Sequence, residues 1–328
     1  MDIAAQYSDD RSAPPSTLVI FGASGDLTRR KLIPAVASLA RHGRLPKEFA
    51  LVGVARTPMS DDEFAASVLG DRAHDGLGDL AQLAGGGLRY VHGGYDDPET
   101  YKNLATLLDE LDHQRGTRGN HLFYLSTPPQ AFTPIINGLA GAGLNHARSD
   151  DGFARLVIEK PYGTDLASAR QLDATVHTAF DEQQVFRIDH YLGKDTVQNV
   201  LALRFANSIF QPIWDRSWVD HVQITVAETL GVGTRGSFYE TAGAMRDIVQ
   251  NHVLQVLALA LMEPPASFGA EALRNEKVKL LQAIRLPTPS VSATVIWTWS
   301  IQVRFQMGWK IRLAKRSAIT FWTVSLPR

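Results

Sequence analysis

The side chains best suited to bind a phosphate group lie in one short segment, residues 187–194 (RIDHYLGK). His190 and Lys194 are four residues apart, so a helical turn would bring two cations and the Tyr191 hydroxyl close together. Cationic donors arranged in this way suit the oxygens of a phosphate. The alternative is a structural cluster of polar residues at the end of a strand.

His252 is the candidate for proton transfer. It lies beside the apolar side of a helical pattern in residues 246–252 (RDIVQNH), where many histidines are simply buried and hydrogen-bonded. If Asp189 holds one ring nitrogen, the other nitrogen can accept a proton. The pair is therefore suited to act as the base that oxidation of a sugar hydroxyl requires.

A glycine turn follows the first apolar run, residues 17–21 (TLVIF), and precedes a helical pattern that Pro34 interrupts. Small residues here let backbone N–H groups and a helix N-terminus approach a pyrophosphate. Thr28 stands where the usual third glycine would be, and an ordinary tight turn is the alternative. The residues of the expected cofactor turn are Gly22, Ala23, Ser24, Gly25, Asp26 and Leu27.

Two further positions follow expected strands. Arg56 comes after residues 50–55, where an NAD enzyme would carry an acid and an NADP enzyme a cation for the 2′-phosphate. Lys160, in residues 159–163 (EKPYG), follows another strand and can serve an anionic substrate. Pro161 restricts Lys160 to extended geometry, and a cis bond between them is expected at so tight a turn. Each cation has a plainer alternative as a solvated side chain at a strand end.

The elements that must position these residues alternate between apolar β-rich runs and helical stretches. This rhythm predicts an α/β fold, a doubly wound, Rossmann-like parallel sheet, followed by an incomplete α+β domain. The expected strands are residues 17–21, 50–55, 88–91, 122–125 and 156–158. The expected divisions are a loose tail at 1–16, a dinucleotide-binding domain at 17–184, a partial catalytic domain at 185–290 and an anomalous segment at 291–328.

Composition narrows the function classes. The 328 residues include no cysteine, which excludes disulfides and thiolate chemistry and fits a cytoplasmic location. All 34 acidic residues lie at or before Glu276, and that acidic body argues against nucleic-acid binding. The most apolar stretch, residues 253–262, is too short to cross a bilayer, so no membrane association is expected. No metal site is expected either.

Residues 291–328 differ from the rest because they contain no acid and four of the six tryptophans. We interpret them as an altered or out-of-frame end, with an aromatic and basic binding surface as the alternative.

Four motifs together resemble the glucose-6-phosphate dehydrogenase family over about residues 17–289. GASGDL, EKPYG, RIDHYLGKD and RDIVQNH occur in that family's order and approximate spacing. The resemblance implies oxidation of the C1 hydroxyl of glucose 6-phosphate to the lactone with reduction of NADP, the first step of the oxidative pentose phosphate pathway. Sugar oxidoreductases with an EKP segment and a helical histidine, which lack RIDHYLGK, are the alternative enzyme class.

The resemblance also implies roles for single residues. It makes His252 the general base and Asp189 its orienting carboxylate. The residues it assigns to the substrate are His190, Tyr191, Lys194, Lys160, Glu228 and Asp247. On the cofactor side it adds Arg56, Tyr124 and Lys160 to the glycine turn.

The chain departs from the family after Pro289. Family members continue with a large antiparallel sheet that supplies further substrate lysines and the contact of the homo-oligomer, and neither is recognisable here. A non-catalytic, NADP-binding protein is therefore an alternative of a different class.

Overall fold

The computed structural model describes residues 12–70, 77–149, 151–222, 224, 245–284 and 304–305. Contacts divide the chain into an N-terminal unit, Ser8–Ile188, and a C-terminal unit that begins at Asp189. Every helix within the described ranges is too short or too polar to span a lipid bilayer.

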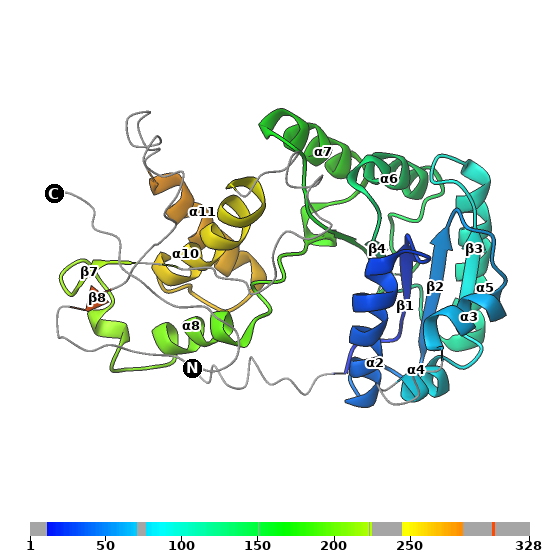
Figure 1. The fold of residues 1–328 in the computed structure, drawn as a ribbon, viewed down its shortest axis with the longest axis horizontal. Coiled ribbons are helices and arrows are strands. Elements are labelled where there is room, and N and C mark those ends of the chain that lie inside the picture. The colour runs from blue at the N-terminus through cyan, green and yellow to red at the C-terminus, as the bar shows by residue number, and fades with distance from the viewer. Residues whose placement is uncertain are drawn as a thin grey trace. The chain divides into compact units, whose positions relative to one another are not determined.

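The N-terminal unit is built on a six-stranded parallel sheet with the strand order β3-β2-β1-β4-β5-β6 (Figure 1). Its strands are β1 (Ser16–Phe21), β2 (Phe49–Ala55), β3 (Leu88–His92), β4 (His121–Leu125), β5 (Ala154–Ile158) and β6 (Val185–Arg187). The chain runs outward from β1 in one direction through β3 and then returns to β4 on its other side. This order confirms the expected doubly wound, Rossmann-like sheet. The change of rhythm expected at about Val185 falls at β6, which pairs with β5 in this same sheet.

Alternating side chains of the strands enter two separate cores. On β1, Val19 and Phe21 pack in a cluster with residues of α5, α6 and α7, whereas Ile20 packs with residues of α2, α3 and α4. The sheet is therefore covered by helices on both faces, as buried parallel strands require (Figure 1). The helices are α2 (Ile33–Arg41), α3 (Asp61–Leu69), α4 (Leu77–Ala84), α5 (Pro98–Arg115), α6 (Phe132–Gly141) and α7 (Leu166–Ala179), with short 3₁₀ turns η2 (Pro129–Ala131) and η3 (Glu182–Gln184).

Polar residues begin three of these helices. The Ser60, Asp97 and Asp165 side chains accept hydrogen bonds from backbone N–H groups in the first turns of α3, α5 and α7. These caps satisfy donors that have no partner within the helix.

The first helical stretch does not break at Pro34. It starts as a π-helical segment, η1 (Thr28–Leu32), and becomes regular α-helix at Ile33. Pro34 lies in the first turn of α2, where its missing N–H costs least. The expected interruption is thus a change of helix type immediately after the glycine turn.

The C-terminal unit contains the helices α8 (Asp195–Phe205), α10 (Leu254–Leu261) and α11 (Ala270–Ala283), with η4 (Gln211–Ile213) and the π-helical η6 (Met245–Val253). Two short strands, β7 (Val219–His221) and β8 (Arg304–Phe305), pair antiparallel. Buried residues of α8, η6 and α10 form the core of this unit together with Val222 and Ile224. The other residues of the expected alternating segment 222–226, and all of 291–328 except β8, lie outside the described residues.

One buried cation joins α8 to α10. Arg204 donates hydrogen bonds to the carbonyls of Leu259 and Met262, at 2.7 and 2.8 Å. Burial lowers the pKa of Arg204 to about 10, which still leaves the guanidinium charged at neutral pH. This clamp fixes the helix that continues directly from the segment carrying His252.

Candidate active site

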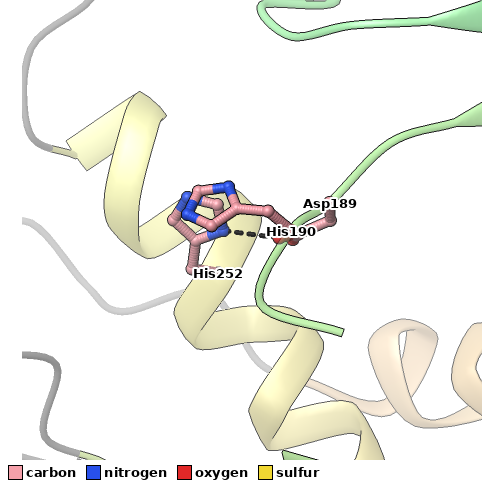
Figure 2. A group of neighbouring side chains, drawn as sticks. All are labelled: Asp189, His190 and His252. Carbon is pink, nitrogen blue, oxygen red and sulfur yellow. Dashed lines mark hydrogen bonds and ion pairs between the residues drawn. The ribbon is translucent and has the colours of Figure 1, made fainter. Parts of the chain in front are cut away.

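His252 and Asp189 are in direct contact in the C-terminal unit. His252 Nδ1 lies 2.6 Å from Asp189 Oδ1, and the imidazole is fully buried (Figure 2). Because an ionised carboxylate can only accept, His252 donates this hydrogen bond from Nδ1. Asp189 Oδ1 also accepts from the backbone N–H of Tyr191 at 2.9 Å, which fixes the carboxylate. The pair has the arrangement of an oriented general base.

Two neighbouring rings surround this imidazole. Tyr191 is 1% exposed and stacks on His252 with ring centroids 3.9 Å apart. His190 is exposed and meets His252 edge-on, with centroids 4.6 Å apart. Lys194 places its Nζ 3.5 Å from the centroid of the Tyr191 ring. The structure therefore brings polar residues of segment 187–194, namely Asp189, His190, Tyr191 and Lys194, together near His252.

The donor atoms of Asp189, His190 and His252 all lie within 4.8 Å of one another (Figure 2). Such spacing occurs in metal sites as well as in hydrogen-bonded acid–base pairs. Since Asp189 Oδ1 already accepts from two N–H groups, we interpret the group as a hydrogen-bonded pair with a neighbouring imidazole. The expectation that no metal binds stays a prediction.

The glycine turn of the N-terminal unit packs tightly against the backbone that follows β4. Gly22 adopts φ +84°, and a Cβ there would collide with the carbonyl oxygen of Ser126. The N–H of Gly25 closes the turn on the Gly22 carbonyl at 2.9 Å. Only glycine fits at the first position.

Thr28 locks the same turn from the position of the missing third glycine. It is fully buried, its Oγ1 donates to the Gly22 carbonyl at 3.1 Å, and the same oxygen is hydrogen-bonded to Ser126 Oγ at 3.1 Å. Sequence reasoning treated Thr28 only as a departure from the glycine pattern and did not find Ser126. The signal for Ser126 was its place directly after β4, beside β1 in the sheet.

Arg56 follows β2 and is exposed, as its expected role at a 2′-phosphate requires. Its guanidinium carbon lies 5.8 Å from the ring centroid of Tyr95, a residue that the sequence analysis did not single out. Burial raises the pKa of Tyr95, and the Arg56 charge and the Gly22 N–H oppose this shift. Tyr95, on the loop after β3, therefore interacts with both Arg56 and the glycine turn.

The EKPYG segment forms a second polar group at the same edge of the sheet. The Lys160–Pro161 bond is cis, as expected. The Tyr124 hydroxyl donates to Glu159 Oε1 at 2.6 Å, and burial together with this carboxylate raises the pKa of Tyr124. Tyr124 thus contacts the residue next to Lys160, a link that the sequence could not show.

Two expected substrate residues cannot be placed. Glu228 lies outside the described residues, and Asp247 is described only through its backbone in η6. The remaining expected residues form two groups, one around His252 and one around the glycine turn and EKPYG.

A doubly wound sheet with a glycine turn after its first strand, combined with a carboxylate-held histidine, is typical of oxidoreductases that use a dinucleotide cofactor. Two family models agree with this class. "Glucose-6-phosphate dehydrogenase, NAD binding domain" matches residues 19–199, and "Glucose-6-phosphate dehydrogenase, C-terminal domain" matches residues 201–303. The chain belongs to the glucose-6-phosphate dehydrogenase family. The second match continues past residue 289, where the motif resemblance was expected to end.

Curated relatives cover most of this chain. Glucose-6-phosphate 1-dehydrogenase 2 of Mycobacterium tuberculosis is 49% identical over 284 residues, which is 85% of this chain and 55% of the relative. Glucose-6-phosphate 1-dehydrogenase of Bacillus subtilis is 41% identical over 277 residues, 83% of this chain and 55% of the relative. The chain thus spans about half the length of the curated relatives it matches.

Two solved structures share the fold. A glucose-6-phosphate dehydrogenase in complex with glucose 6-phosphate has a TM-score of 0.74 and 34% identity, covering 83% of this chain and 56% of that chain. The enzyme from Mycobacterium avium has a TM-score of 0.72 and 38% identity, covering 84% and 59%.

Proposed function

We propose that this site oxidises the C1 hydroxyl of glucose 6-phosphate to 6-phosphogluconolactone and transfers the hydride to NADP, the first step of the oxidative pentose phosphate pathway. The observation that carries the proposal is the 2.6 Å contact between His252 and Asp189 beside the ring cluster of His190 and Tyr191. A base next to a phosphate-binding cluster suits a phosphorylated sugar better than a free one.

In the proposed reaction, His252 Nε2 takes the proton of the C1 hydroxyl. Asp189 holds the opposite nitrogen, so the ring keeps one orientation and its developing positive charge is stabilised. The stacked Tyr191 ring keeps water from one face of the imidazole. Proton removal from the hydroxyl strengthens the tendency of C1 to release a hydride.

Binding of the sugar rests on the cations of the same loop. His190 and Lys194 are proposed to hold the 6-phosphate through charge-assisted contacts. Lys160, Glu228 and Asp247 are proposed to hold ring hydroxyls. Substrate orientation of this kind supplies a large part of the barrier reduction in a hydride transfer.

The N-terminal unit fits a dinucleotide. The glycine turn precedes a helix, and its backbone N–H groups are proposed to face the pyrophosphate. Arg56 is proposed to supply the cation for the 2′-phosphate that separates NADP from NAD. NADP bound there would supply the acceptor of the hydride. Gly22 to Leu27, Arg56, Tyr124 and Lys160 are proposed as its contacts.

The test combines calorimetry of NADP binding with a spectrophotometric assay of NADPH formation. We expect NADP to bind the full chain, glucose 6-phosphate to support NADPH formation, and unphosphorylated glucose to support far less. Turnover that does not distinguish the two sugars would favour the wider class of sugar oxidoreductases.

A second candidate is NADP binding without turnover. It needs only the N-terminal unit, in which the glycine turn and the exposed Arg56 lie. Calorimetric binding of NADP together with no NADPH formation at saturating glucose 6-phosphate would establish this function instead.

A further inference from the structure

A half-buried lysine that the proposed reaction does not use contacts the helix that carries the base. Lys277, on α11, donates from Nζ to Gln255 Oε1 at 3.1 Å. Gln255 follows His252 by three residues where η6 continues into α10, which places it about one helical turn away. Lys277 therefore contacts the helix that carries His252, about one turn beyond that residue.

The charge of Lys277 also reaches the other member of the pair. Burial lowers the pKa of Lys277, while the negative charge of Asp189 opposes that shift and Arg274 adds to it. Asp189 thus interacts with two groups, the imidazole N–H bound to its Oδ1 and the ammonium of Lys277.

We propose that Lys277 is a positioning residue for the Asp189–His252 pair, whose ammonium competes with the imidazole for the charge of Asp189 and so limits how firmly His252 holds a proton. A carboxylate without this competitor favours the charged imidazolium, which is useless as a base. The inference rests on the proposed role of His252, but the contacts that carry it do not depend on turnover.

The other charged groups around the pair are few among the described residues. His190 meets the His252 ring edge-on, and Lys194 lies over the stacked Tyr191 ring. Arg274 is the additional cation near Lys277. Removing the Lys277 charge leaves these groups in place, so a change in titration reports on Lys277 itself.

The experiment measures the pH at which the His252 imidazole titrates, by two-dimensional NMR of the full chain, with the signal assigned through His252→Asn. In Lys277→Met we expect the midpoint to move upward by about 0.5 to 1 pH unit. Lys277→Arg keeps the charge and should keep the midpoint. Lys279→Met is the matched control, because Lys279 lies on the same helix with its side chain 62% exposed and paired to Glu276.

An unchanged midpoint in Lys277→Met, or an equal shift in Lys279→Met, would overturn the proposal. If circular dichroism shows that Lys277→Met does not fold, Lys277→Gln carries the same expectation and the same contrary outcome. A shifted midpoint in a chain without turnover would uphold this inference while the proposed function failed.

Discussion

The two units hold their functional groups in different ways. In the N-terminal unit the glycine turn is fixed by backbone geometry and by hydroxyl bonds from Thr28, within a sheet whose cores lie on both faces. In the C-terminal unit the acid–base pair joins side chains 63 residues apart through one 2.6 Å contact and stacked rings. The glycine turn is therefore held mainly by backbone and hydroxyl contacts at one edge of a sheet, whereas the His252–Asp189 pair is held by side-chain packing.

The largest expected effect is a loss of turnover that leaves cofactor binding by the N-terminal unit unchanged. His252→Asn should lower kcat by about three orders of magnitude, because the base acts in the chemical step, and should leave NADP affinity nearly unchanged. Steady-state kinetics beside calorimetry measures both quantities. Preserved kcat with a raised KM would contradict the role of His252.

The next effect concerns the N-terminal unit alone, in its stability and its binding of NADP. Gly22→Ala places a Cβ against the Ser126 carbonyl at a positive φ, so we expect a loss of about 2 kcal/mol of stability and at least about tenfold weaker NADP binding. Gly43→Ala is the control, since Gly43 has φ +65° but open space around it. Chemical denaturation and calorimetry measure the two variants, and equal losses in both would show that the close approach at Gly22 is unimportant.

A smaller effect tests the proposed phosphate contact of Lys194 in the C-terminal unit. Lys194→Ala should raise KM for glucose 6-phosphate by about 10- to 100-fold, because it removes a charged partner of the phosphate. The KM for glucose should hardly change, and Lys194→Arg should restore most of the loss. A similar increase for both sugars would remove Lys194 from the phosphate site.

The smallest effect concerns a surface ion pair of the N-terminal unit. The hydrogen bond to the Asp173 carbonyl raises the pKa of His177, burial opposes this shift, and the Glu182 and Asp173 carboxylates add to the increase. A raised folded-state pKa stabilises the protein below the unfolded value and loses that contribution as pH rises through the folded value. His177→Asn should therefore cost a few tenths of a kcal/mol at pH 5.5 and nothing at pH 8.5, measured by urea denaturation. A loss that is the same at both values would show that His177 acts without its charge.

The sequence predicted the strands and the glycine turn, because each of these has a local residue pattern that is typical of one structure. The apolar runs became β1 to β5 because buried parallel strands tolerate few polar residues. The turn at Gly22 could be expected for a similar reason, since glycine was followed at once by a helical pattern.

What the sequence missed depends on contacts between distant segments. Tyr95 and Ser126 are ordinary loop residues until the sheet order places them beside Arg56 and Gly22. The contact of Asp189 with His252 was expected from the chemistry of the two residues, but the stacking of Tyr191 was not. The stacking of two rings depends on where the fold places their backbones, and the hydrophobic pattern of the sequence does not indicate this.

The hydrogen bond between the Thr28 and Ser126 hydroxyls can form only after both residues have been synthesised. It joins residues 98 apart in the chain. A ribosome adding ~5–20 residues per second needs roughly 5 to 20 s to travel from one to the other. A nascent chain therefore carries its glycine turn for that interval without the Ser126 contact, and the turn reaches its final set of hydrogen bonds only after the residues that follow β4 have emerged.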